Sequence, residues 1–362
     1  MLMAKFLASA ALALTLAQAT PAAAAQNTFA DPLDTPALMT AGALASPVFA
    51  IARIDGDRLA GVGPRGLILI SSDAGRTWRQ VASPVSTDLL AVNFSTPQSG
   101  WIAGHNGILL HSSDGGASWK KMLDGRDLGP MMAAFYTKLQ ANGDSPEIAA
   151  ALDEARAITD EVPSRPFLDV WFRNAEEGWA VGQFNLILHT SDGGATWEPW
   201  MERTGNPERL SLHAIRGAGD DVYIAGELGL VLKLSPDGSR FDSVQTPYPG
   251  SYFGLLGSAS EVVVFGLRGN TWRSRDQGAT WSQLPTGVTS AINAGIRLSD
   301  GRILLVAQGG QVLMSHATGD GLTVARPEEI GAGFGLLQLS EQEALVATRQ
   351  GIKQLTLPPA KE

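Results

Sequence analysis

The chain has 362 residues, of which 44% are hydrophobic and 17% charged, with 41 glycines and 9 tryptophans. This composition suits one large all-β domain and excludes a disordered or fibrous protein. The formal net charge of -9 argues against a nucleic-acid partner, since phosphate binding requires clustered lysine and arginine. There is no cysteine, which excludes disulfides, thiolate metal sites and a lipid-modified cysteine anchor.

The first segment, residues 1–25, has the pattern of a secretory signal peptide. Lys5 supplies a positive start, Phe6 to Ala17 is apolar, and Ala23 to Ala25 is a small-residue cleavage site. A membrane anchor is the alternative, but about twelve apolar residues fall short of the ~20 that span a bilayer. We therefore expect an exported, periplasmic protein that has no membrane span after cleavage.

An octapeptide, S/T-x-D-x-G-x-T/S-W, recurs at residues 71–78, 112–119, 190–197 and 274–281. Its aspartate can accept hydrogen bonds from the N–H groups ahead of it, glycine can take a positive φ, and tryptophan has a large area to bury. We call these octapeptides Asp boxes. We expect structural roles for their aspartate, glycine and tryptophan residues: Asp73, Gly75, Trp78, Asp114, Gly116, Trp119, Asp192, Gly194, Trp197, Asp276, Gly278 and Trp281.

A second turn lies upstream of each Asp box and is more regular. Its last residue is at Gly66, Gly107, Asn185, Gly229, Gly269, Gly310 and Gly351, a period near forty with one long interval. Around the second of these turns, Leu89 to Phe94, Trp101 to Ala103, Ile108 to His111 and Trp119 to Met122 form four short apolar runs. Such a repeat predicts a seven-bladed β-propeller with strands a to d in each blade, and an open solenoid is the alternative.

The predicted organisation follows from this period. Residues 26–46 precede the first blade, 47–124 form blades 1 and 2, and 167–358 form blades 3 to 7. The seventh repeat stops before a d strand, so we expect residues of about 33–45 to supply that strand and close the ring.

The long interval, residues 125–166, has helical composition. Met131 to Gln140 and Ser145 to Asp160 carry alanine, leucine, methionine and charged residues at helical spacing, and Ser145-Pro146-Glu147 is a favourable helix start. We expect a helical hairpin inserted between strand d of blade 2 and strand a of blade 3.

Few residues suggest chemistry. Gly61 to Gly66 matches G-x-G-x-x-G, but a strand follows where a dinucleotide site needs a helix. His111 and His189 occupy the same place in different repeats, which is too far apart for a shared metal. We therefore expect no cofactor and no metal.

The turns between strands b and c provide a better candidate. In a propeller these turns and the d–a connections open on one face, and the Asp boxes lie on the opposite rim. We expect this face to bind a partner, using polar groups and one aromatic ring at equivalent places: Arg65, His105, Asn106, Gln183, Phe184, Glu227, Arg268 and Arg349.

The pattern G-W-x-x-G-x-x-G-x-I-L-x-T/S-S-D-G-G-x-T-W, at residues 100–119 and 178–197, is similar to the repeat of the photosystem II stability/assembly factor propellers. The resemblance covers about residues 48–357 without the insertion. It implies a seven-bladed, non-enzymatic propeller that docks on a membrane protein complex during its assembly. A related periplasmic transporter-accessory role is equally consistent with the sequence, and we expect a monomer. The photosynthetic members of that family use an arginine-rich surface patch, to which Arg65, Arg268 and Arg349 could correspond.

Asp boxes also occur in glycoside hydrolases, so a sialidase-like enzyme is the alternative. Such a site needs an arginine triad, a tyrosine nucleophile beside a glutamate, and an acid. The start of blade 1, Phe49 to Arg53, lacks the Y/F-R-I-P motif that these enzymes carry. The available tyrosines, which show no obvious partner in the sequence, are Tyr136, Tyr223, Tyr248 and Tyr252.

Overall fold

The computed structural model describes residues 30–161, 164–316, 321–326 and 330–359. The predicted signal peptide lies outside these residues. All the elements described below belong to the compact unit Asp31–Glu362. No helix in the described part of the chain is long and apolar enough to cross a membrane.

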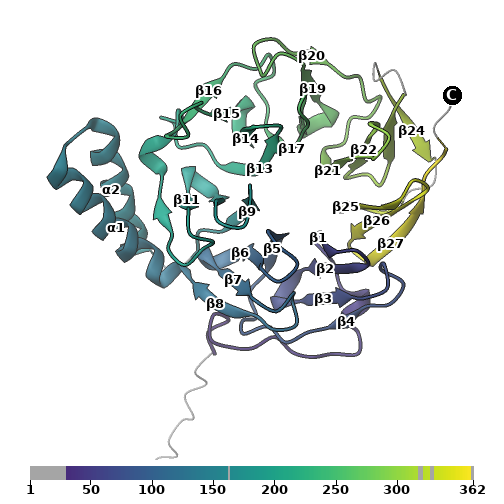
Figure 1. Ribbon diagram of the computed structural model, residues 1–362, viewed down its shortest axis with the longest axis horizontal. Helices are drawn as coiled ribbons and strands as arrows, with labels where there is room; N and C mark the ends of the chain where they lie inside the picture. Colours follow the sequence, from purple (N-terminus) through teal and green to yellow (C-terminus); the bar gives the residue numbers. More distant parts are fainter. Residues whose placement is uncertain (1–29, 162–163, 317–320, 327–329, 360–362) are drawn as a thin grey trace, which may run out of the picture. The chain divides into compact units, whose positions relative to one another are not determined.

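Seven antiparallel sheets stand around a common axis, as Figure 1 shows. The inner, a strands of blades 1 to 7 are β1 (Ala50–Asp55), β5 (Leu89–Phe94), β9 (Phe167–Phe172), β13 (Leu212–Ala218), β17 (Tyr252–Gly257), β21 (Ile292–Arg297) and β25 (Gly333–Ser340). The b strands are β2 (Arg58–Val62), β6 (Gly100–Gly104), β10 (Gly178–Gly182), β14 (Asp221–Gly226), β18 (Val262–Gly266), β22 (Ile303–Ala307) and β26 (Glu343–Thr348).

The outer half of each blade follows the same order. The c strands are β3 (Ile68–Ser71), β7 (Leu109–Ser112), β11 (Ile187–Thr190), β15 (Val231–Leu234), β19 (Thr271–Ser274), β23 (Val312–Ser315) and β27 (Gly351–Thr356). The d strands are β4 (Arg79–Gln80), β8 (Lys120–Leu123), β12 (Glu198–Pro199), β16 (Phe241–Val244), β20 (Ser282–Gln283) and β24 (Leu322–Arg326).

Each inner strand contacts the inner strand of the next blade, and β25 contacts β1, so the ring is closed. The predicted seven-bladed propeller is therefore confirmed. The b strands are buried along almost their whole length because a neighbouring blade covers each of their faces, and they read as near-continuous apolar runs.

The prediction that residues of about 33–45 supply the fourth strand of blade 7 is wrong. Blade 7 has only β25, β26 and β27 in the described part of the chain, and residues 31–46 form no strand there. This segment is held along the outer strands of blades 1 and 2 instead: Thr40 N–H donates to Gln80 Oε1 (3.0 Å), and Lys121 Nζ donates to Leu33 O (2.8 Å). Its last turn, η1 (Ala43–Ala45), lies against β27 and β4.

The predicted helical hairpin is present as α1 (Gly125–Asn142) and α2 (Pro146–Asp160), capped at their starts by Asp124 and Ser145. It lies outside blade 3 (Figure 1) and packs on the short turn η5 (Met201–Arg203). The anchor is Tyr136, whose buried hydroxyl donates to Glu202 Oε2 (2.8 Å) and accepts from Met201 N–H (2.9 Å).

Candidate functional site

The hydrogen bonds to the aspartate recur in all four Asp boxes, whereas the indole bond recurs only in blades 1 and 2. In blade 2, Asp114 Oδ1 accepts from the Ser118 N–H (2.9 Å) and the Ser112 hydroxyl (2.8 Å), while Oδ2 accepts from the Ser118 hydroxyl (2.6 Å). The Ser112 hydroxyl also accepts from Gly116 N–H (2.8 Å), and the Trp119 indole donates to Gly116 O (3.2 Å). Each aspartate is thus engaged by its own turn.

These bonds act mainly on the charged form of the carboxylate. The side-chain hydroxyl of Thr77, Ser118, Thr196 or Thr280, followed by the same residue's N–H, lowers the pKa of the matching aspartate to about 2. A carboxylate held in this way stays ionised and is a poor general acid at neutral pH.

The b–c turns lie at the other end of the strands and share a backbone feature. All seven predicted end residues, including Asn185, have a positive φ. In five of the turns the preceding residue is also left-handed although it is not glycine: Arg65 (φ 54), Asn106 (φ 58), Phe184 (φ 54), Leu228 (φ 50) and Arg268 (φ 57). Bulky residues rarely adopt this conformation, and such strain concentrates at functional sites.

Exposed apolar side chains lie on the b–c turns of blades 3 to 5, the last of them being Leu267 of blade 5, which is 38% exposed. Phe184 is 51% exposed, and Leu228, at the equivalent place in blade 4, is 62% exposed. The guanidinium of Arg165, which also pairs with Glu154 of α2, lies 5.1 Å from the Phe184 ring centre. The sequence reasoning identified Phe184 but missed Leu228, although both occupy the same repeat position.

Two hollows flank this surface. One of about 250 Å³ lies between α2 and the b–c turn of blade 3, where Phe184 and Arg209 form part of its wall. The other, of about 420 Å³, lies between Leu228 and the d–a connection that contains Pro247 and Tyr248. The insertion therefore reaches the b–c turn face at its edge, although most of it packs on the side of blade 3.

The other predicted face residues are spread around the ring. Arg65, Arg268 and Arg349 are exposed on blades 1, 5 and 7, so they form no single cluster. His105 is exposed beside Asn106, whose Oδ1 accepts from the Thr87 hydroxyl (2.6 Å). Two others have bonded groups: Gln183 N–H donates to Pro166 O (3.3 Å), and Glu227 Oε2 accepts from Ser211 N–H (2.8 Å).

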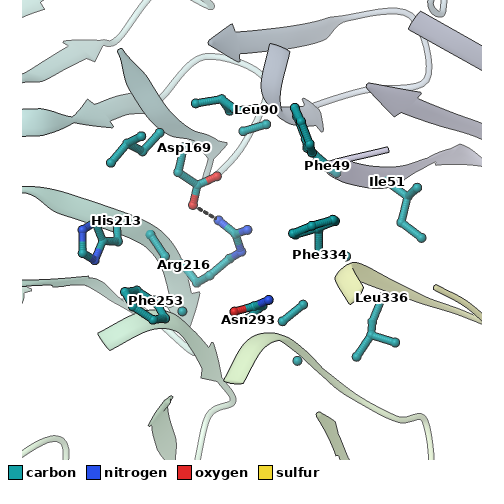
Figure 2. Close-up of a pocket in the computed structure, with 18 of the residues that line it drawn as sticks. Phe49, Ile51, Leu90, Asp169, His213, Arg216, Phe253, Asn293, Phe334 and Leu336 are labelled. Atoms are coloured by element: carbon teal, nitrogen blue, oxygen red, sulfur yellow. Dashed lines mark hydrogen bonds and ion pairs between the residues drawn. The ribbon is translucent and has the colours of Figure 1, made fainter. Parts of the chain in front are cut away.

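The channel holds a cavity of about 350 Å³ that the sequence reasoning did not anticipate. Figure 2 shows Arg216 of β13 reaching into it and pairing with Asp169 of β9. Asp169 is buried and also accepts from Ile215 N–H (2.9 Å). Burial raises the pKa of Asp169, while the Arg216 charge and the N–H donors act in the opposite direction. The rings of Phe49 and Phe334 meet edge to face 5.7 Å apart.

A repeat comparison could have found Asp169. At its place in strand a, the other six blades carry alanine or glycine: Ala50, Ala91, Ala214, Gly254, Ala294 and Gly335. Asp169 is the only carboxylate among the described residues that line the cavity. A glycosidase needs two carboxyl groups, about 5–9.5 Å apart, so this cavity does not present that arrangement.

Two of the four tyrosines, Tyr136 and Tyr252, are poorly suited to be the nucleophile of the alternative site. Tyr136 has a glutamate partner, Glu202, contrary to the sequence-based expectation. Burial first, and then the Glu202 charge, raise the pKa of Tyr136 well above its ordinary value. Burial raises the pKa of Tyr252 to about 12. A phenol that holds its proton this firmly is a weak nucleophile.

The chain matches known proteins over most of its length. A family model described as photosynthesis system II assembly factor YCF48 matches residues 45–140 and 153–329. Photosystem II assembly lipoprotein Ycf48 of Synechococcus sp. (strain CC9902) is 27% identical over 169 residues, 46% of this chain and 50% of that protein. The same protein of Parasynechococcus marenigrum (strain WH8102) is 30% identical, with the same coverage. The chain thus spans about half the length of these curated relatives.

Solved structures show the same fold at low identity. One, described as YCF48 bound to D1 peptide, has a TM-score of 0.62 and 14% identity, and covers 90% of this chain and 96% of its own. YCF48 from Cyanidioschyzon merolae has a TM-score of 0.61 and 16% identity, covering 87% and 96%.

Proposed function

The chain belongs to the photosynthesis system II assembly factor YCF48 family, and on that premise we propose that it is a non-catalytic assembly factor for a membrane protein complex. It binds an exposed segment of its partner on the b–c turn face. The observation that carries the proposal is the exposure of Phe184 and Leu228 on strained turns of adjacent blades, beside two hollows.

The chemistry of this face suits a peptide segment. Exposed apolar side chains with hollows on either side can bury the side chains of an extended or helical segment. Arg268 and, further round the ring, Arg349 and Arg65 add positive charge, which favours a segment with acidic residues or a carboxylate. One related structure is described as bound to a D1 peptide, so peptide binding has a precedent in the family.

The partner meets the protein on the exported side of a membrane, where a cleaved signal peptide 1–25 would deliver a monomeric propeller. The related proteins are named lipoproteins, whereas this chain has no cysteine to carry a thioether-linked lipid.

A binding experiment tests the proposed face. The mature protein is crosslinked in its native host, partners are identified by mass spectrometry, and capture of the main membrane partner is compared between variants. We expect the double substitution Phe184→Ala, Leu228→Ala to weaken capture at least tenfold, and charge reversal at Arg65, Arg268 and Arg349 to weaken it further.

The matched control is Arg76→Glu, which reverses an exposed charge on the opposite, Asp-box rim. Unchanged capture by the face variants, or equal loss in the control, would contradict the proposed face. The absence of catalysis is tested separately with fluorogenic glycosides: turnover that disappears in Asp169→Asn would identify an enzyme.

A further inference from the structure

In the described part of the chain, blade 7 ends at β27 with no fourth strand beside it, and η1 lies against the start of β27 at Gly351. In blades 1, 3 and 5 the first residue after strand d donates to the carbonyl at the same position of strand c: Val81 N–H to Ile68 O (3.0 Å), Trp200 N–H to Ile187 O (3.1 Å), and Leu284 N–H to Thr271 O (2.9 Å). Ile68 is opposite Val62, and the corresponding pair in blade 7 is Ile352 and Ala347. Ile352 O is therefore the equivalent acceptor.

The next outward-facing residue on β27 is Gln354, because outward-facing backbone groups alternate along an antiparallel strand. Gln354 holds the register position of His111 in blade 2, which is opposite Lys120, the residue after Trp119. Within the described residues, no hydrogen bond is recorded to Ile352 O or to the outward backbone groups of Gln354. Such an edge is a template for another strand.

A cavity with both apolar and polar walls lies beside the chain that leaves β27. Its volume is about 480 Å³, and its wall includes Met314 and Ala325 of blade 6 and Pro358 beyond β27. Met314 corresponds in register to Ile70 of blade 1, which packs in the same apolar cluster as Trp119 of blade 2. The cavity is thus at the place where an Asp-box tryptophan of blade 7 would lie.

The cavity is continuous with an existing interface. Met314 and Ala325 of blade 6 pack in one apolar cluster with Leu336 and Leu355 of blade 7. A side chain entering the cavity would extend this cluster in the way that Trp119 extends the contact between blades 1 and 2. The segment that could have supplied the strand in cis, residues 33–45, is bonded to blades 1 and 2 instead.

We propose that an extended segment of a partner protein adds to β27 as the fourth strand of blade 7 and places a bulky aromatic residue in the Met314 cavity. The backbone of Ile352 and Gln354 supplies sequence-independent hydrogen bonds, and the cavity selects the aromatic side chain. This surface is separate from the b–c turn face, and it does not depend on that face being a binding site.

The chain's own repeat provides a probe. A fluorescent peptide copying residues 115–123, which contain Trp119 and the d strand of blade 2, is titrated into the full chain and followed by anisotropy. We expect saturable binding, and at least tenfold weaker binding for the same peptide with alanine in place of tryptophan.

Two variants locate the binding. Gln354→Pro removes the outward N–H at an exposed edge position, where proline is tolerated, while Gln354→Ala loses the same side chain and keeps the N–H. We expect Gln354→Pro to weaken peptide binding at least tenfold and Gln354→Ala to bind normally. If Gln354→Pro does not fold, Ala325→Phe fills the cavity from β24 and is expected to weaken binding to the same degree.

Hydrogen exchange separates the possible occupants. We expect the Gln354 amide to exchange rapidly in the chain alone and to be protected by the peptide. Protection in the chain alone would overturn the proposal, because another segment of this chain or a second copy would already fill the edge. Absence of peptide binding, or equal binding to Gln354→Pro and Gln354→Ala, would also overturn it. Variants of Phe184 and Leu228 should leave peptide binding unchanged.

Discussion

The Asp boxes and the b–c turns lie at opposite ends of the same strands and use their residues in opposite ways. In the Asp boxes the residue types are nearly identical from blade to blade, and their polar groups bond within the turn. In five of the b–c turns the backbone has the same left-handed residue, but its type changes from arginine to asparagine, phenylalanine and leucine. Repeated side chains therefore stabilise the ring, whereas variable side chains on a repeated backbone are available for recognition.

The largest expected effect is on the structural side of this comparison. Trp119→Ala removes a ring that is only 6% exposed and packs with Ile70 of blade 1. We expect a loss of about 3–5 kcal/mol in the free energy of unfolding, measured by denaturant titration. Trp78→Ala, at a less buried Asp box, should cost less. A loss below about 1 kcal/mol for Trp119→Ala would contradict the structural role.

The second largest effect is expected at the helical insertion, where a buried hydroxyl joins α1 to η5. Tyr136→Phe keeps the ring but removes the hydroxyl that bonds to Glu202 and Met201. Because both partners then lose a bond in a buried site, we expect a loss of about 1–3 kcal/mol. Tyr248→Phe, which removes a single bond from a more exposed hydroxyl to Leu267 O (3.1 Å), is the control. Equal stability of Tyr136→Phe and the parent chain would show that the pair does not anchor the hairpin.

In the b–c turns we expect a substitution to raise the free energy of unfolding. Leu228→Asn replaces a bulky residue at positive φ with one that tolerates this conformation. We expect the free energy of unfolding to rise by about 0.5–1 kcal/mol and partner capture to fall. If Leu228→Asn is less stable than the parent chain, or captures the partner normally, the b–c turns do not differ from the Asp boxes in the way described above.

The smallest expected effect per residue is the pH dependence of the Asp boxes. In the folded protein the pKa of these aspartates is about 2, below the ordinary value of 3.8. Their contribution to the free energy of unfolding is therefore complete above pH 3.8 and is lost as the pH falls towards 2. Burial raises the pKa of Glu202, so its protonation acts in the opposite direction. We expect the melting temperature to fall between pH 5 and pH 2, and Asp114→Asn to make that fall less steep. An identical slope in Asp114→Asn would contradict this assignment.

The sequence predicted the ring because its signals are local. A glycine or asparagine at the end of each b–c turn and an aspartate in each Asp box act within a few residues, so a single repeat reveals them. The helical insertion was also readable from its composition and its proline start. The closing strand was not, because residues 33–45 carry no repeat signal and their place depends on distant partners such as Gln80 and Lys121.

The site was predictable only in part. The position of Phe184 follows from the repeat, but the importance of Leu228 depends on its exposure, which is a property of the folded face. The pair of Asp169 and Arg216 joins adjacent blades on the wall of the channel, so its geometry required the structure. Even so, the departure of Asp169 from alanine and glycine at that place was visible in the sequence.

Among the described residues, the ring is closed without a strand shared between its two ends. Where blade 7 meets blade 1, the contacts include the hydrogen bond from Val48 N–H to Thr348 O (3.0 Å) and the edge-to-face rings of Phe49 and Phe334. A strand shared between blades 7 and 1 would add a row of backbone hydrogen bonds, and an applied force would have to break all of them together. Under tension applied between Asp31 and Pro359, this seam should separate before any other pair of blades, and the remaining sheets should follow one after another.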